Sequence, residues 1–91
     1  MVTAIIMMNV ERKEINTVAE QLAGMDEISE VYSVSGNHDL VAMVRVSTND
    51  ELSDLVTKKI LMIPSILRTE TLLAFRAYSR HDLEAMFDIA D

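Results

Sequence analysis

The sequence predicts an α+β domain with a ferredoxin-like βαββαβ order: a four-stranded antiparallel sheet with two helices on one face, followed by a short C-terminal helix. Three observations predict this fold class. Apolar residues switch between strand-like and helix-like spacing in the order strand, helix, strand, strand, helix, strand. A short loop with Gly and Asn joins the middle strands, as in a hairpin. Two right-handed βαβ crossovers around a hairpin give a split sheet.

The first half of the chain is expected to form a strand, a helix and two further strands. Residues 2–10 are apolar and end at a charge cluster, as a buried strand does. From Glu11 the period becomes that of an amphipathic helix, and Gly24 stands where a left-handed C-terminal cap is expected. Residues 28–35 alternate like a second strand, and a turn leads into a third strand over residues 40–47.

The second half repeats the helix and the strand. Thr48 and Glu51 have the spacing of a capping box, which predicts that a helix begins there. Pro64 is expected to end that helix, because proline lacks the N–H group that a helix interior needs. Residues 66–78 are rich in threonine and aromatic residues, and we expect them to form a long fourth strand.

The length of the chain bounds its organisation. At 91 residues the chain suffices for one modest core and leaves no room for a second folded module. A capping signal at residues 79–82 predicts a short terminal helix. We therefore expect one domain over residues 1–78 and a helical extension over residues 79–91.

Charge and composition exclude several classes of protein. Eight basic and fifteen acidic residues give a net charge of −7, so we expect no direct nucleic-acid partner and no membrane partner. Cys is absent, which excludes disulfides and thiolate chemistry and is typical of a reducing compartment. No apolar run approaches the roughly 20 residues of a membrane span, and residues 2–8 lack the basic region of a signal peptide. A cytoplasmic protein is expected.

The strands carry apolar residues on both faces, although two short helices can cover only one face. This pattern is clearest in residues 4–8, 40–44 and 72–75. A second copy on the open face would remove the apolar patch from water, so the pattern predicts a homodimer. The alternative is that the terminal helix folds back over that face, but about ten residues would cover only part of it.

The sequence lacks the residue sets that most catalytic sites and metal sites need. The two His residues lie far apart in the sequence, so we expect no metal site, and no cofactor is expected either. Ser35, His38 and Asp39 supply the residue types of a hydrolytic triad, but within one short loop they cannot align. We therefore expect no enzyme. The alternative is a cofactor-free oxygenase of the dimeric ferredoxin-like type, which holds an aromatic substrate between helices and sheet.

The remaining polar residues lie in the hairpin loop and at the start of the last strand. They are Gly36, Asn37, His38, Asp39, Thr69 and Thr71. Asp39 offers an acceptor for the ammonium group of an amino acid, backbone N–H groups beside Gly36 offer donors for its carboxylate, and the threonine hydroxyls add directional bonds. The alternative is an ordinary hairpin turn in which Asp39 bonds its own loop.

Two segments resemble a known family. Residues 31–41 carry Gly36 and Asp39 at the positions of a Gly-x-x-Asp signature, and residues 63–73 are similar to the helix-end proline and threonine-bearing strand of the same family. That family is the Lrp/AsnC ligand-binding domain, also called the RAM domain, and the resemblance covers about residues 2–77. It implies an amino-acid effector near the contacts between dimers, face-to-face packing of two sheets as a dimeric α+β barrel, and rings of dimers.

The family's typical members carry an N-terminal helix-turn-helix domain, whereas this chain begins at the first strand. It resembles a stand-alone form, which we expect to act without its own DNA-binding domain and to enter mixed assemblies with full-length regulators. ACT domains are the nearest rival, but they favour Gly in the first strand-to-helix turn, and residues 9–12 contain none. An oligomerisation module with a vestigial ligand site is a third interpretation.

Overall fold

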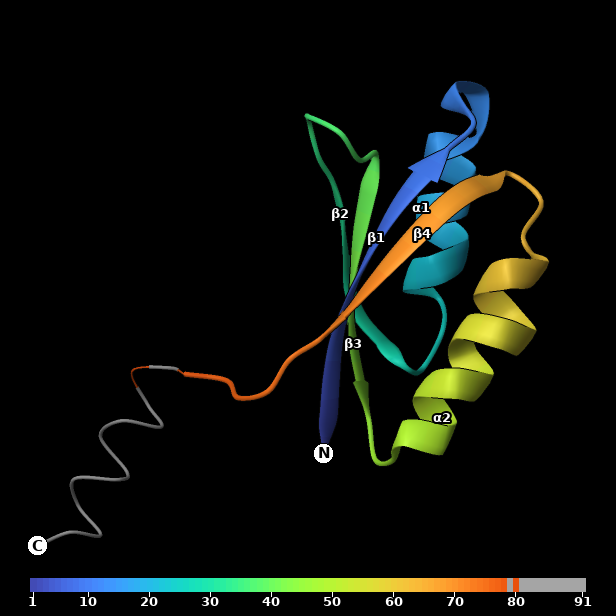
Figure 1. The fold of residues 1–91 in the computed structure, drawn as a ribbon. Helices are drawn as coiled ribbons and strands as arrows, with labels where there is room; N and C mark the ends of the chain where they lie inside the picture. The colour runs from blue at the N-terminus through green and yellow to red at the C-terminus, as the bar shows by residue number, and fades with distance from the viewer. Residues whose placement is uncertain (79, 81–91) are drawn as a thin grey trace, which may run out of the picture.

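The structure, a computed structural model, describes residues 1–78 and residue 80 and has the predicted ferredoxin-like α+β fold. The elements follow the predicted order: β1 (Val2–Val10), α1 (Ile15–Ala23), β2 (Ile28–Ser33), β3 (Leu40–Val46), α2 (Asn49–Asp54) and β4 (Ile66–Leu73). The strands form one antiparallel sheet in the order β2-β3-β1-β4. Both helices lie on the same side of the sheet, and none of the described elements covers its other side (Figure 1).

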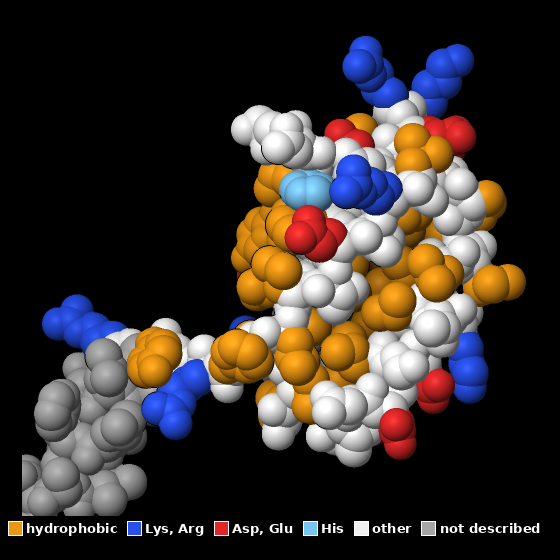
Figure 2. Space-filling view, in the orientation of Figure 1, with side chains coloured by type: hydrophobic (Ala, Val, Ile, Leu, Met, Phe, Trp, Pro, Cys, Tyr) orange, Lys and Arg blue, Asp and Glu red, His pale blue; other side chains and the backbone are white. Residues whose placement is uncertain are grey.

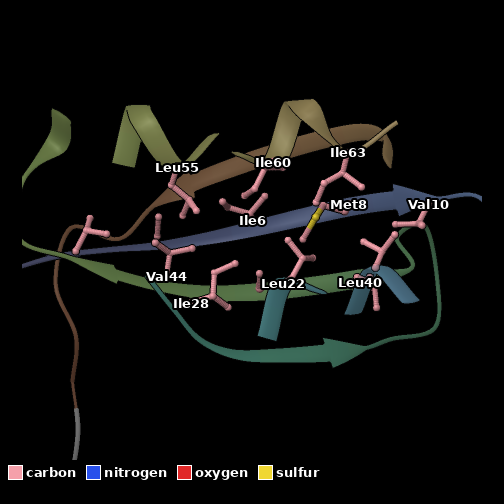
Figure 3. Packing of buried hydrophobic residues seen from close by; sticks show 14 residues of the cluster. Ile6, Met8, Val10, Leu22, Ile28, Leu40, Val44, Leu55, Ile60 and Ile63 are labelled. Atoms are coloured by element: carbon pink, nitrogen blue, oxygen red, sulfur yellow. The ribbon is translucent and has the colours of Figure 1, made fainter. Parts of the chain in front are cut away.

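The two central strands bury every second residue beneath the helices. These residues are Ala4, Ile6, Met8 and Val10 of β1 and Leu40, Ala42, Val44 and Val46 of β3. Leu22 from α1 and Leu55 and Ile60 from the helical turns after α2 pack against them, and each is fully buried (Figure 3). We call this side of the sheet the covered face and the opposite side the open face.

Helix α2 begins as its capping box predicts. The hydroxyl of Thr48 accepts a hydrogen bond from the backbone N–H of Glu51 at 3.1 Å, and the Glu51 carboxylate accepts one from the N–H of Ser47 at 3.0 Å. The helical path continues through a π-helix (Leu55–Lys59) and a 3-10 helix (Ile60–Met62), so it ends two residues before Pro64. The change of pitch keeps both Leu55 and Ile60 in the core.

Two local predictions are wrong. Gly24 has φ −80°, which is right-handed rather than left-handed, because the last turn of α1 tightens and Met25 donates its N–H to the carbonyl of Leu22 at 3.0 Å. Strand β4 ends at Leu73 rather than at residue 78. Its neighbour β1 begins at Val2, so β4 has no partner beyond the bond from the N–H of Ala74 to the carbonyl of Thr3 at 2.9 Å.

The expected terminal helix lies outside the described residues. Of residues 79–91 the structure describes only residue 80. The division of the chain at residue 78 therefore stays a prediction. Within the described residues, no helix is long and apolar enough to cross a membrane.

Candidate functional site

The loop between β2 and β3 takes its shape from Gly36. This residue has φ +104°, a left-handed conformation that L side chains rarely adopt. A Cβ atom added there would meet nothing within 4 Å. The requirement for glycine is therefore one of backbone conformation and not of space.

Asp39 ties this loop to the end of β1. Its backbone N–H donates to the carbonyl of Met8 at 2.8 Å, and its carbonyl accepts from the N–H of Val34 at 3.0 Å. Its side-chain Oδ2 accepts a part-buried hydrogen bond from the N–H of Val10 at 2.8 Å. The Asp39 side chain thus bonds β1 and not its own loop, which differs from the ordinary-turn alternative.

A polar hollow of about 470 Å³ opens beside the loop, where β1 and β4 run past each other. Its lining residues are Asn9, Asn37, His38, Arg68 and Glu70. The amide Nδ2 of Asn9 donates to the carbonyl of Asn37 at 2.7 Å, and Nε2 of His38 lies 3.8 Å from Oε2 of Glu70. The buried Nδ1 of His38 makes no hydrogen bond with any described residue. We call this feature the polar hollow.

The sheet register places the polar hollow on the open face. Met8, which is buried beneath the helices, lies opposite Thr69. The next pairs on either side, Asn9 with Arg68 and Met7 with Glu70, therefore point to the open face. Figure 2 shows the pale blue histidine with acidic and basic side chains beside it, at the edge of an apolar area.

The structure brings together only part of the predicted site. Asn37 and His38 line the polar hollow, and Gly36 and Asp39 shape the loop that carries them. Thr69 and Thr71 lie opposite Met8 and Ile6, so their side chains point to the covered face of β4, away from the hollow.

Three lining residues were missing from the predicted set. Arg68 and Glu70 alternate with the two threonines along β4, and the period of two in a strand places the pairs on opposite faces. Asn9 is the last residue of β1 that points to the open face, because the next residue, Val10, is buried beneath the helices. The sequence signal for Asn9 was a polar residue near the end of an otherwise apolar strand.

The open face itself is apolar. Its central side chains are half-buried or exposed: Ile5, Met7, Val41, Met43 and Leu72. Tyr32 lies at its β2 edge and donates its hydroxyl to the Glu30 carboxylate, a bond that raises the pKa of Tyr32. The apolar area spreads over the side of the molecule that faces away from the helices (Figures 1 and 2).

A second, smaller group of charges lies near α2. Lys59 donates to Oε2 of Glu27 at 2.6 Å, and this hydrogen bond lowers the pKa of Glu27 below its usual value. Lys58 pairs with Asp54 at 3.3 Å on the surface of the same helical segment. Across residues 1–78 and 80, no group of three or more potential ligands could hold a metal ion.

Comparisons with known proteins agree on one family. Residues 3–83 match the family described as the Lrp/AsnC ligand binding domain. An uncharacterized HTH-type transcriptional regulator of Pyrococcus furiosus is 33% identical over 70 residues, which are 77% of this chain and 47% of that protein. The crystal structure of TTHA0845 from Thermus thermophilus is 45% identical with a TM-score of 0.82, covering 88% of this chain and 100% of that chain.

The fold, the loop and these matches together define a ligand-binding domain of the kind found in transcriptional regulators. The chain belongs to the Lrp/AsnC family. The structure of E. coli AsnC, at 25% identity, matches with a TM-score of 0.80 over 86% of this chain and 53% of that chain. The chain spans about half the length of the regulators that it matches in sequence.

Proposed function

We propose that the chain is a small-molecule effector-binding and oligomerisation domain of the Lrp/AsnC family, which binds an amino acid beside the loop Gly36–Asp39 and acts by association rather than by chemistry. The observation that carries this proposal is the position of the polar hollow next to that loop, at the edge of an apolar sheet face. A polar site at the rim of an association surface lets a bound molecule alter that association. The cytoplasm is the proposed compartment, as expected for such regulators.

The proposed site keeps the predicted loop at its centre. Asn37 and His38 face the polar hollow, and Gly36 gives the loop the conformation that presents them. Asp39 as the acceptor of the ammonium group, and Thr69 and Thr71 as additional hydrogen-bonding groups, stay predictions. Since the threonines lie on the covered face of β4, their substitution tests whether the ligand contacts that side of the strand.

Calorimetry across the twenty amino acids tests the proposed effector binding directly. We expect saturable binding of at least one amino acid and no turnover of it. If none of them binds, the ligand-binding part of the proposal fails and the oligomerisation module with a vestigial site becomes the better interpretation.

The proposed assembly uses the open face. The half-buried side chain of Met43 and the exposed side chain of Leu72 would be covered by the same face of a second copy in a homodimer, and further contacts between dimers would give rings. Light scattering at micromolar concentration tests this idea. A mass of at least twice 10.2 kDa is expected, and a stable monomer would contradict it.

An enzyme is not favoured. A cofactor-free oxygenase of this fold would hold an aromatic substrate between helices and sheet, and here Ile6, Leu22 and Leu55 fill that space with fully buried aliphatic side chains. Turnover of an aromatic substrate in oxygenated buffer would contradict the proposal.

Direct DNA binding is also not proposed for this chain. Its net charge of −7 opposes binding to phosphate backbones. In a gel-retardation assay at physiological salt we expect no specific complex with the chain alone. A change in the complex formed by a full-length family member when this chain is added would support mixed assembly.

A further inference from the structure

Beyond β4 the chain continues as a short segment outside the sheet. Residues 74–78 leave the sheet on the side away from the helices, so they project past the open face (Figure 1). The last backbone bond to the sheet is the one from the N–H of Ala74 to the carbonyl of Thr3. Within the described chain, residues 75–78 make no hydrogen bond and no ion pair. We call residues 74–78 the arm.

The arm holds two of the three aromatic side chains among the described residues. Phe75 is fully exposed, and 73% of the surface of Tyr78 is exposed. The third, Tyr32, also lies on the surface, and the core is aliphatic throughout. Aromatic side chains are enriched at protein interfaces, because each covers a large area with few rotatable bonds. Two of them on a segment without contacts of its own indicate that the arm packs against another surface.

Charge also separates the arm from the rest of the chain. Residues 71–81 include two arginines and no acidic residue, in a chain with a net charge of −7. The turn between α1 and β2 is the opposite, since Asp26 and Glu27 are adjacent there and residues 24–33 include no basic residue. Glu27 is paired with Lys59, whereas Asp26 is exposed and bonds no other described residue. The arm and this turn are therefore complementary in charge.

The sheet register shows which part of a second copy the arm would meet. One row across the four strands contains Ile28, Val44, Ala4 and Leu73. In the antiparallel order β2-β3-β1-β4, the two edge strands β2 and β4 run in opposite directions. A two-fold axis along the strands of two sheets packed face to face places β4 of one copy over β2 of the other, with Leu73 level with Ile28. The arm then runs on toward the residues before Ile28, which are those of the acidic turn.

We propose that the arm of each copy docks on the turn between α1 and β2 of a second copy, with Arg76 paired to Asp26. Phe75 and Tyr78 then cover Met25, a half-buried side chain of that turn. Arginine suits this contact because its planar guanidinium can donate two parallel hydrogen bonds to a carboxylate. The proposal rests on the homodimer of the proposed function and adds a contact outside the open face, which a two-fold dimer forms twice.

Charge reversal in the full 91-residue chain tests the pair. Arg76→Glu and Asp26→Arg should each raise the dissociation constant of the dimer by about tenfold or more, because each places like charges together in both contacts. The double variant rebuilds the pair with exchanged signs, so its dissociation constant should return to within about threefold of wild type. Sedimentation over a dilution series measures these constants.

Arg12→Glu is the matched control for Arg76→Glu. It makes the same change at an exposed residue of the 3-10 helix before α1 (Arg12–Glu14), at the other end of α1 from the turn. We expect its dissociation constant to stay close to wild type. Asp26→Arg makes the chain less acidic, so weakening by this variant is not a result of net repulsion. Equal weakening by Arg12→Glu and Arg76→Glu, or no recovery in the double variant, overturns the proposal.

The absence of Cys from the chain allows a direct test of proximity. A chain with Ala77→Cys is mixed with a chain of different mass that carries Met25→Cys, and the thiols are oxidised. We expect a disulfide between the two chains, because docking brings the arm to the turn. Lys13→Cys in place of Met25→Cys is the control and should give no such link. In a chain with both cysteines, a link within one copy would show that the arm folds onto its own turn and would overturn the proposal.

The mass of the wild-type chain separates failure of this proposal from failure of the proposed function. If light scattering shows a stable monomer, the homodimer and the docked arm fail together. If the chain is a dimer that Met43→Asp dissociates, yet charge reversal and thiol oxidation reveal no contact between arm and turn, only the docked arm is wrong. The proposed function then stands.

Discussion

The two faces of strand β1 differ in what covers them. Ile5 and Ile6 are adjacent and chemically identical, yet Ile6 has 0% of its surface exposed and Ile5 is only half-buried. The helices complete the covered face within a single chain, whereas none of the described residues completes the open face. The covered face therefore accounts for folding, and the open face, with the polar hollow at its end, accounts for the proposed association and binding.

The largest expected effect is on association through the open face. Met43 lies opposite Ile5 on β1 and Glu30 on β2, at the centre of this face. Met43→Asp would place an unpaired charge in the proposed interface, at a cost of about 3–5 kcal/mol. Light scattering should show dissociation to a folded monomer. An unchanged mass would move the interface elsewhere.

Leu73→Asp is the matched control for that substitution. Leu73 lies opposite Ala4, so it belongs to the covered side of β4 although 49% of its surface is exposed at the sheet edge. We expect this variant to keep the wild-type mass. Dissociation by Leu73→Asp but not by Met43→Asp would reverse our assignment of the two faces.

The next effect separates folding from association at neighbouring positions. Ile6→Ala removes a fully buried side chain from the core and should lower the free energy of unfolding by about 2–5 kcal/mol. Ile5→Ala should act mainly through the dimer, so its effect on urea unfolding should depend on protein concentration. If Ile5→Ala lowers stability by the same amount at every protein concentration, the Ile5 side chain stabilises the folded monomer, as Ile6 does.

A smaller effect on stability is expected from Asp39, which ties the loop between β2 and β3 to the end of β1. Asp39→Ala leaves the N–H of Val10 without its acceptor and should cost about 1–3 kcal/mol of stability. Asp39→Asn keeps an acceptor oxygen for that bond, so we expect stability close to wild type. It removes the charge of the predicted ammonium acceptor, so we expect amino-acid affinity to fall by about ten- to hundredfold. Unchanged affinity for a bound amino acid would show that Asp39 only holds the loop and does not contact the ammonium group.

The fold was largely predictable because periodicity reports burial beneath the helices. The apolar runs that form β1 and β3 and the capping box at Thr48 are local signals, and both are confirmed. The end of β4 could not be predicted, because a strand ends where the neighbouring strand ends. Its partner β1 starts at Val2, which no pattern within residues 66–78 records.

The candidate site was less predictable because it depends on which face each residue takes. The stretch from Arg68 to Thr71 is polar throughout, so composition marks all four residues equally. Only the pairing of β4 with β1 assigns Arg68 and Glu70 to the open face. Strand register is a long-range property, since a slip of one residue exchanges the two faces.

The smallest expected effect concerns the bond between the helical layer and the sheet. Lys59 follows α2, Glu27 immediately precedes β2, and their hydrogen bond lowers the pKa of Glu27 below its usual value of 4.5. A carboxyl group with a lowered folded-state pKa adds stability above its unfolded pKa. That stability is lost as the pH falls through the folded-state value. Because both side chains are partly exposed, about 0.5 kcal/mol is expected at pH 7.

Urea unfolding of wild type and Glu27→Gln at pH 7 and at the lowest pH at which both proteins stay folded measures this contribution. The difference between the two proteins should be present at pH 7 and should shrink at the lower pH, because wild-type Glu27 becomes increasingly protonated there and resembles the neutral glutamine. Lys59→Met should remove the same pH-dependent part, and the double variant should add nothing further, since both changes delete one interaction. A difference of equal size at both pH values would show that Glu27 contributes by packing. The helical layer would then be held to the sheet by its apolar contacts alone.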